Sequence, residues 1–104
     1  MGLDLRGIKI SIIGGDKRDI YLMQDLVKLG ASVTAVGFHP CPELAQVHLV
    51  DKLEAAISKA QVLILPMGGT DLEGNIKTLD PDITLRLSPE IAATIPEGVI
   101  LIIG

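Results

Sequence analysis

Apolar residues along this chain fall in short runs that end at glycine, proline or charged positions. Nearly continuous runs rich in β-branched residues and leucine occupy residues 8–13, 32–36, 62–65 and 99–103. A short run that is apolar throughout is typical of a strand buried on both faces of a parallel sheet. We therefore expect these four segments to be buried, central-type strands.

Between the first two runs the apolar spacing changes to that of a helix. Ile20 and Met23 lie three residues apart on a predicted apolar face. Asp16 can cap the N-terminus of this helix, and Gly30 can follow its C-terminus, so a helix over about residues 17–29 is predicted. A strand, a helix and a second strand joined by short loops form a βαβ unit, which makes the sheet parallel.

Further along the chain the pattern predicts two more helices. Residues 47–50 can form a short strand or only an extended segment, and Asp51 is then expected to cap a helix over 51–60. Ser88-Pro89-Glu90 is a strong helix start, because serine suits the N-cap, proline the first helical position and an acid the first turn.

Residues 75–78 and 83–87 flank a turn and predict a short, exposed β-hairpin.

The alternation of predicted strands and helices along the chain makes the fold class α/β. We expect a Rossmann-like or flavodoxin-like three-layer domain with a mostly parallel sheet and a short β-hairpin insertion. Its length of 104 residues fits one domain over 1–104.

Composition removes several classes of function. The net charge is −4 with scattered Lys and Arg, and Tyr21 and Phe38 are the aromatic residues, so nucleic acid is not expected as a partner. No apolar run approaches the roughly 20 residues that span a bilayer, and the first residues do not resemble a signal peptide. With one cysteine, Cys41, a cytoplasmic protein is expected. His39 and His48 lack partners at metal-ligand spacing, so no metal is expected.

Ligands of open α/β sheets bind outside the carboxyl ends of the strands. Residues 14–18, 37–42 and 66–71 follow three predicted strands and should share this edge. The first segment is not a dinucleotide fingerprint, because the G-x-G-x-x-G pattern needs glycine where Asp16 and Asp19 stand. No cofactor is therefore expected to bind this turn.

The first candidate site consists of Gly14, Gly15, Asp16 and Arg18. A cation in the first turn of a helix gains nothing from the helix dipole, whereas a planar guanidinium beside backbone N–H groups suits a carboxylate. We interpret these four residues as substrate-binding. The alternatives are that Asp16 only caps the helix and that Arg18 only reaches water.

The second candidate site is the loop Gly68, Gly69 and Thr70. These residues can bring the backbone close to a substrate, with the Thr70 hydroxyl as donor, or they can simply give the strand exit its positive φ angles. The residues do not identify a catalytic proton donor or acceptor.

Taken in order, these motifs resemble the amino-terminal domain of the A subunit of dipicolinate synthase. The resemblance covers all 104 residues and rests on Ile12-Ile13-Gly14-Gly15-Asp16-x-Arg18, Val36-Gly37-Phe38, Leu63-Ile64-Leu65-Pro66 and Glu73-Gly74. The first of these elements is the most specific.

The resemblance implies that the whole protein is an NAD(P)-dependent oxidoreductase, which oxidises dihydrodipicolinate to dipicolinate during sporulation. It implies that NAD or NADP is bound by a downstream dinucleotide-binding domain absent from this chain, and that a flavoprotein-like second subunit is a partner. Residues 1–104 would then be a substrate-side domain, inactive alone, that binds a small dicarboxylate. Whether the protein also forms a homo-oligomer stays an open question.

Two other classes of function fit the residues. One is a non-catalytic small-ligand-binding or regulatory domain of flavodoxin-like topology. The other is an interaction module whose hairpin, residues 75–87, contacts a partner.

Overall fold

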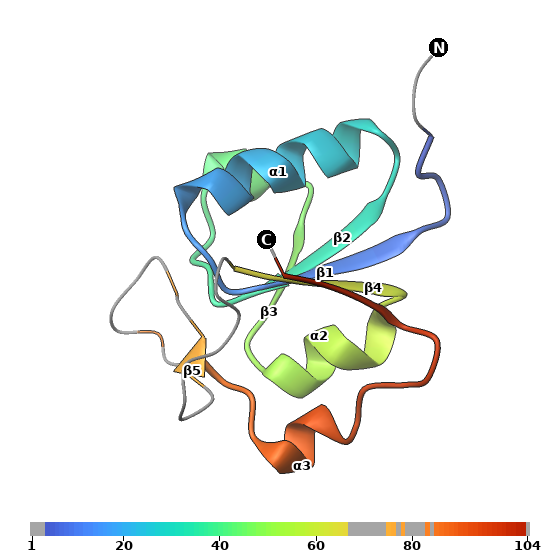
Figure 1. The fold of residues 1–104 in the computed structure, drawn as a ribbon. Coiled ribbons are helices and arrows are strands. Elements are labelled where there is room, and N and C mark those ends of the chain that lie inside the picture. The colour runs from blue at the N-terminus through green and yellow to red at the C-terminus, as the bar shows by residue number, and fades with distance from the viewer. Residues whose placement is uncertain (1–3, 67–74, 77, 79–82, 84, 104) are drawn as a thin grey trace.

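The computed structural model describes residues 4–66, 75, 76, 78, 83 and 85–103. The described part of the chain contains one large sheet of parallel strands in the order β3-β2-β1-β4-β7 (Figure 1). Its strands are β1 (Lys9–Ile13), β2 (Ser32–Val36), β3 (His48–Val50), β4 (Val62–Leu65) and β7 (Ile100–Ile103).

This strand order decides between the two expected topologies. The Rossmann order begins 3-2-1-4, whereas the flavodoxin order begins 2-1-3-4. In this chain β1 lies between β2 and β4, so the first half of the sheet has the Rossmann order. The direction in which strands are added reverses between β1 and β4.

Helices lie on both faces of the sheet, which confirms the three-layer architecture. Helix α1 (Lys17–Lys28) and the 3₁₀ turn η1 (Pro42–Leu44) cover one face, and α2 (Leu53–Lys59) and α3 (Pro89–Ala92) cover the other (Figure 1). Adjacent side chains of β1 point to opposite faces of the sheet. Ile12 packs with Met23 of α1, and Ile13 packs with Ile57 of α2.

The first strand is less apolar than expected. We predicted burial on both faces, but Lys9 is exposed and Ser11 is a buried polar residue on the α2 face. The Ser11 hydroxyl donates a 2.7 Å hydrogen bond to the carbonyl of Ala56 in α2. This bond satisfies the hydroxyl and brings α2 close to the strand.

The helix starts agree with the sequence in two cases out of three. Asp16 caps α1, and the Ser88 hydroxyl accepts a 3.2 Å hydrogen bond from the Ile91 amide at the start of α3. The prediction that Asp51 caps α2 is wrong. The helix begins at Leu53, so the N-cap is Lys52, whose ammonium has no acceptor and makes no side-chain cap bond. Asp51 lies one residue too early to be the N-cap.

The hairpin is confirmed, but its exposure is not. Strands β5 (Asn75–Ile76) and β6 (Leu85–Arg86) pair antiparallel. Ile76 and Leu85 are buried in the core cluster on the α2 face, with Ile13 and Val36 of the main sheet. The hairpin therefore helps to close the core.

The last strand was expected to be buried, and this prediction is wrong. Strand β7 lies at the end of the sheet, and its residues are 44–58% exposed. The opposite edge strand, β3, is shorter and has exposed His48 at its start.

Candidate functional site

The turn after β1 is built around two glycines. The Gly14 amide donates a 2.9 Å hydrogen bond to the Val36 carbonyl, which ties the turn to the end of β2. Gly14 and Gly15 have φ angles of 66° and 124°, a region that other residues rarely adopt. A Cβ on Gly15 would also overlap the carboxylate of Asp19, so a side chain at this position would displace that carboxylate.

Asp16 and Asp19 together form a capping box at the start of α1. The Asp16 carboxylate accepts a 2.9 Å hydrogen bond from the Arg18 amide, and the Asp19 carboxylate accepts a 2.9 Å bond from the Asp16 amide. The cap role of Asp16 is thus confirmed. Asp19 was missed by the sequence analysis, although an acid three residues after an N-cap is the usual signal for this motif.

The Arg18 guanidinium lies on the Asp16 carboxylate. Its Nη2 is 3.0 Å from Asp16 Oδ2, and its Nε is 3.3 Å from Asp16 Oδ1. The side-chain hydrogen bond to Asp16, followed by the charge of Asp16, raises the pKa of Arg18 above its usual value. Because the Arg18 side chain is 68% exposed, this ion pair is a surface pair and its main effect is to orient the guanidinium.

The Arg18 pair stands where α/β domains bind their ligands. The turn follows the carboxyl end of β1, and β1 and β4 are the strands between which the sheet order reverses. The hairpin approaches the same edge. A Cβ on Gly37 would lie 2.7 Å from Leu85 and 3.4 Å from both Gly14 and Thr78. The loops after β1 and β2 and the hairpin therefore meet, which the sequence analysis did not foresee.

The carboxylate of Glu43, in η1, is affected by groups of both η1 and α1. The pKa of Glu43 is lowered below its usual value. The causes are hydrogen bonds from the Glu43 backbone amide and the Cys41 side chain, and then the charge of Lys17. Of the two cations in the first turn of α1, Arg18 has its head group held in a fixed orientation by two hydrogen bonds to Asp16.

Gly68, Gly69 and Thr70 lie outside the described residues. Among the residues that are described, no group of three or more His, Cys, Asp or Glu could hold a metal ion. Within the same residues, none of the helices is long and apolar enough to cross a membrane.

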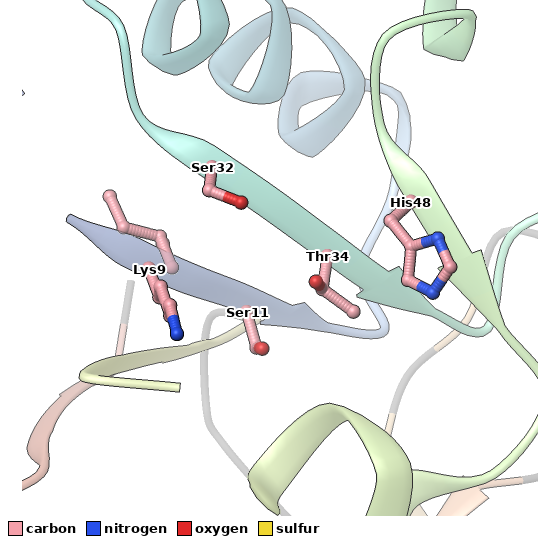
Figure 2. A pocket seen from close by; sticks show the side chains of 6 residues that line it. Lys9, Ser11, Ser32, Thr34 and His48 are labelled. Atoms are coloured by element: carbon pink, nitrogen blue, oxygen red, sulfur yellow. The ribbon is translucent and has the colours of Figure 1, made fainter. Parts of the chain in front are cut away.

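A separate hollow of about 400 Å³ lies on the sheet face beside α2 (Figure 2). Its lining residues are Lys9, Ile10, Ser11, Ser32, Thr34 and His48. Figure 2 shows that the labelled polar side chains come from β1, β2 and β3. The hollow shares no residue with the turn after β1, and its polar lining suits a face in contact with water.

The fold and the turn define a Rossmann-like α/β domain with a capped helix and an oriented arginine at the strand-order reversal. The turn after β1 does not carry a dinucleotide fingerprint. The chain belongs to the family described as the N-terminal domain of the dipicolinate synthase A subunit, which matches residues 9–104.

Two solved structures share this fold. The A subunit of dipicolinate synthase from Bacillus halodurans superposes with a TM-score of 0.80 at 24% identity, covering 96% of this chain and 34% of that one. The A chain of dipicolinate synthase from Bacillus subtilis gives a TM-score of 0.84 at 24% identity, covering 98% and 35%. The chain thus spans about a third of the length of these relatives. A comparison with curated proteins gave no match.

Proposed function

We propose that this chain is the substrate-side domain of an NAD(P)-dependent oxidoreductase, which oxidises dihydrodipicolinate to dipicolinate in the cytoplasm of sporulating cells. NAD or NADP would be bound by a downstream domain, and a flavoprotein-like second subunit would be the partner. Family membership and the length of the solved relatives support this assignment.

Arg18 is the residue proposed to bind a carboxylate of the substrate. A guanidinium has five N–H groups, and two of them face Asp16, which leaves three for a ligand. These three make no hydrogen bond with the part of the chain that the structure describes. The single observation that carries the proposal is this oriented, exposed fork at the carboxyl end of a central strand.

The backbone amides of the turn contribute less than the sequence suggested. The Asp16 and Asp19 carboxylates accept hydrogen bonds from the amides of Arg18, Asp19 and Asp16, and the Asp19 amide also bonds to the Asp16 carbonyl. Carboxylate binding therefore depends on the guanidinium. Asp16 would act as a positioning residue, because its carboxylate fixes the plane of the fork.

A kinetic test uses Arg18→Lys and Arg18→Ala in the full-length enzyme. Both should lower kcat/KM by about 10- to 100-fold, the scale of one charge-assisted hydrogen bond, with the KM for NAD(P) unchanged. Lys17→Gln is the matched control, since it removes the neighbouring exposed cation, and it should stay within about twofold.

Product inhibition shows whether the lost contact is to a carboxylate. The wild-type enzyme should bind pyridine-2,6-dicarboxylate more tightly than pyridine-2-carboxylate, and Arg18→Ala should reduce this preference. If kcat/KM and the preference both stay at wild-type values, the assignment of Arg18 is wrong.

A further inference from the structure

The α2 face of the sheet changes character along its strands. At the carboxyl ends of β1 and β2, Ile13 and Val36 belong to the core cluster that packs with α2. On the opposite face, the neighbouring residues of the same strands are apolar, among them Ile10 and Val33. At the amino ends, by contrast, the α2 face is polar on three neighbouring strands, with Lys9 and Ser11 of β1, Ser32 and Thr34 of β2, and His48 of β3.

The strand register places these polar side chains in two rows (Figure 2). Lys9 lies opposite Ser32 in the first row, and Thr34 lies opposite both Ser11 and His48 in the second. From the usual strand spacing and rise, the Cα atoms of Lys9 and His48 at opposite corners are about 12 Å apart. Long side chains at such positions can reach one small ligand. The hollow of about 400 Å³ that they line also has the size of a small-ligand pocket.

The Thr34 hydroxyl shows that this hollow is more than a solvated surface. Thr34 is 8% exposed, yet its hydroxyl makes no hydrogen bond with the part of the chain that the structure describes. No fully buried side-chain nitrogen or oxygen atom of the described residues lacks a partner, so the Thr34 oxygen opens on the hollow. Ser11 differs, because its hydroxyl already bonds to Ala56. A nearly buried hydroxyl without a protein partner needs a water or a ligand to satisfy it.

The charge of the hollow favours an anion. Lys9 supplies an ammonium, which forms no ion pair with the described residues, and no Asp or Glu is among the residues that line the hollow. The side chains of Ser32 and His48 likewise make no hydrogen bond within the described part of the chain. Two hydroxyls, an imidazole and an ammonium can all donate hydrogen bonds. A negatively charged group that only accepts them would satisfy all four.

We propose that the hollow binds a small oxyanion, a phosphate or a carboxylate group, between Lys9, Ser32, Thr34 and His48. The ammonium neutralises its charge, and the Thr34 hydroxyl donates the most buried of the hydrogen bonds. The hollow lies at the amino ends of β1 and β2, whereas the turn with Arg18 follows the carboxyl end of β1. It is therefore a second site, and it does not depend on the reaction proposed above.

Calorimetric titration of the full-length protein with inorganic phosphate, and separately with succinate, tests this site. The titrations use Arg18→Ala as the background, which removes the guanidinium of the other site, and a constant ionic strength. At least one of the two probes should bind. Lys9→Gln and Thr34→Val should each weaken its binding by about 10-fold or more, the scale of a hydrogen bond to a charged group. Lys17→Gln, the control for an exposed cation on α1, should stay within about twofold.

The two probes also distinguish the two kinds of oxyanion. Binding of phosphate alone would assign a phosphate group to the site, and binding of succinate alone would assign a carboxylate. If neither probe binds at millimolar concentration, the proposal is overturned. Binding that is unchanged in both Lys9→Gln and Thr34→Val overturns it as well, because the anion then lies elsewhere.

The melting temperature without ligand separates a binding role of Thr34 from a structural one. Thr34→Val keeps the shape of the side chain and removes a hydroxyl without a protein partner, so the melting temperature should stay within about 1 °C or rise. Ser11→Ala removes a hydroxyl that bonds to Ala56. This variant should lower the melting temperature by about 2–4 °C while its affinity for the anion stays within about twofold. A similar fall for both variants would contradict the proposal, because the Thr34 hydroxyl would then be structural.

Discussion

Replacing Gly15 with alanine tests whether the turn after β1 depends on its capping box. The new Cβ would overlap the Asp19 carboxylate, which accepts the Asp16 amide and cannot move without losing that bond. The backbone at Gly15, with φ 124°, is also strained for alanine. Loss of a cap costs about 1 kcal/mol and such backbone strain about 1–3 kcal/mol, so we expect a loss of about 2–4 kcal/mol.

Urea unfolding followed by circular dichroism measures this loss, and two controls separate its parts. Gly98→Ala places alanine at φ 84° with no atom within 4 Å, so it reports backbone strain alone. Asp19→Ala reports the lost cap alone. The double variant Gly15→Ala/Asp19→Ala should cost less than the sum of its singles, because removing the carboxylate removes the overlap. A loss below about 0.5 kcal/mol for Gly15→Ala, or strict additivity in the double variant, would refute the reasoning.

Two further predictions concern the hairpin and the cofactor. Leu85→Ala should destabilise the domain by about 2–4 kcal/mol in the same assay, because Leu85 is buried and packs at Gly37; a loss under about 0.5 kcal/mol would show that the hairpin is peripheral. Calorimetric titration of residues 1–104 with NADH should show no binding, because the turn after β1 lacks the dinucleotide fingerprint; a micromolar dissociation constant would contradict the division of roles between domains.

The local signals in the sequence predicted the elements well. The bounds of β2 and β4 agree with the apolar runs, since each run ends at a glycine or proline that also ends the strand. Helix α1 begins after Asp16 as predicted because its cap is a contact between residues two or three apart. Such contacts depend on the neighbouring sequence alone.

Long-range packing was less predictable. The burial of Ile76 and Leu85 depends on contact with Ile13 and Val36, which lie far away in the sequence. The exposure of β7 has a different cause. Among the residues that the structure describes, β7 pairs with β4 on one side only. The prediction of a buried strand failed because burial depends on the elements that pack against the strand, and an apolar run does not specify those elements.

The candidate site shows how structure divides a motif into parts. The capping box explains Gly15, Asp16 and Asp19, and the hydrogen bond to Val36 explains the role of the Gly14 amide. These residues would therefore be needed even in a domain that binds nothing. Arg18 is different, because the cap uses its backbone amide and does not need its side chain. A lysine or glutamine there would keep the backbone amide that the cap uses. The functional content of the motif therefore depends on the guanidinium of Arg18, and the kinetics of Arg18→Lys test it without disturbing the turn.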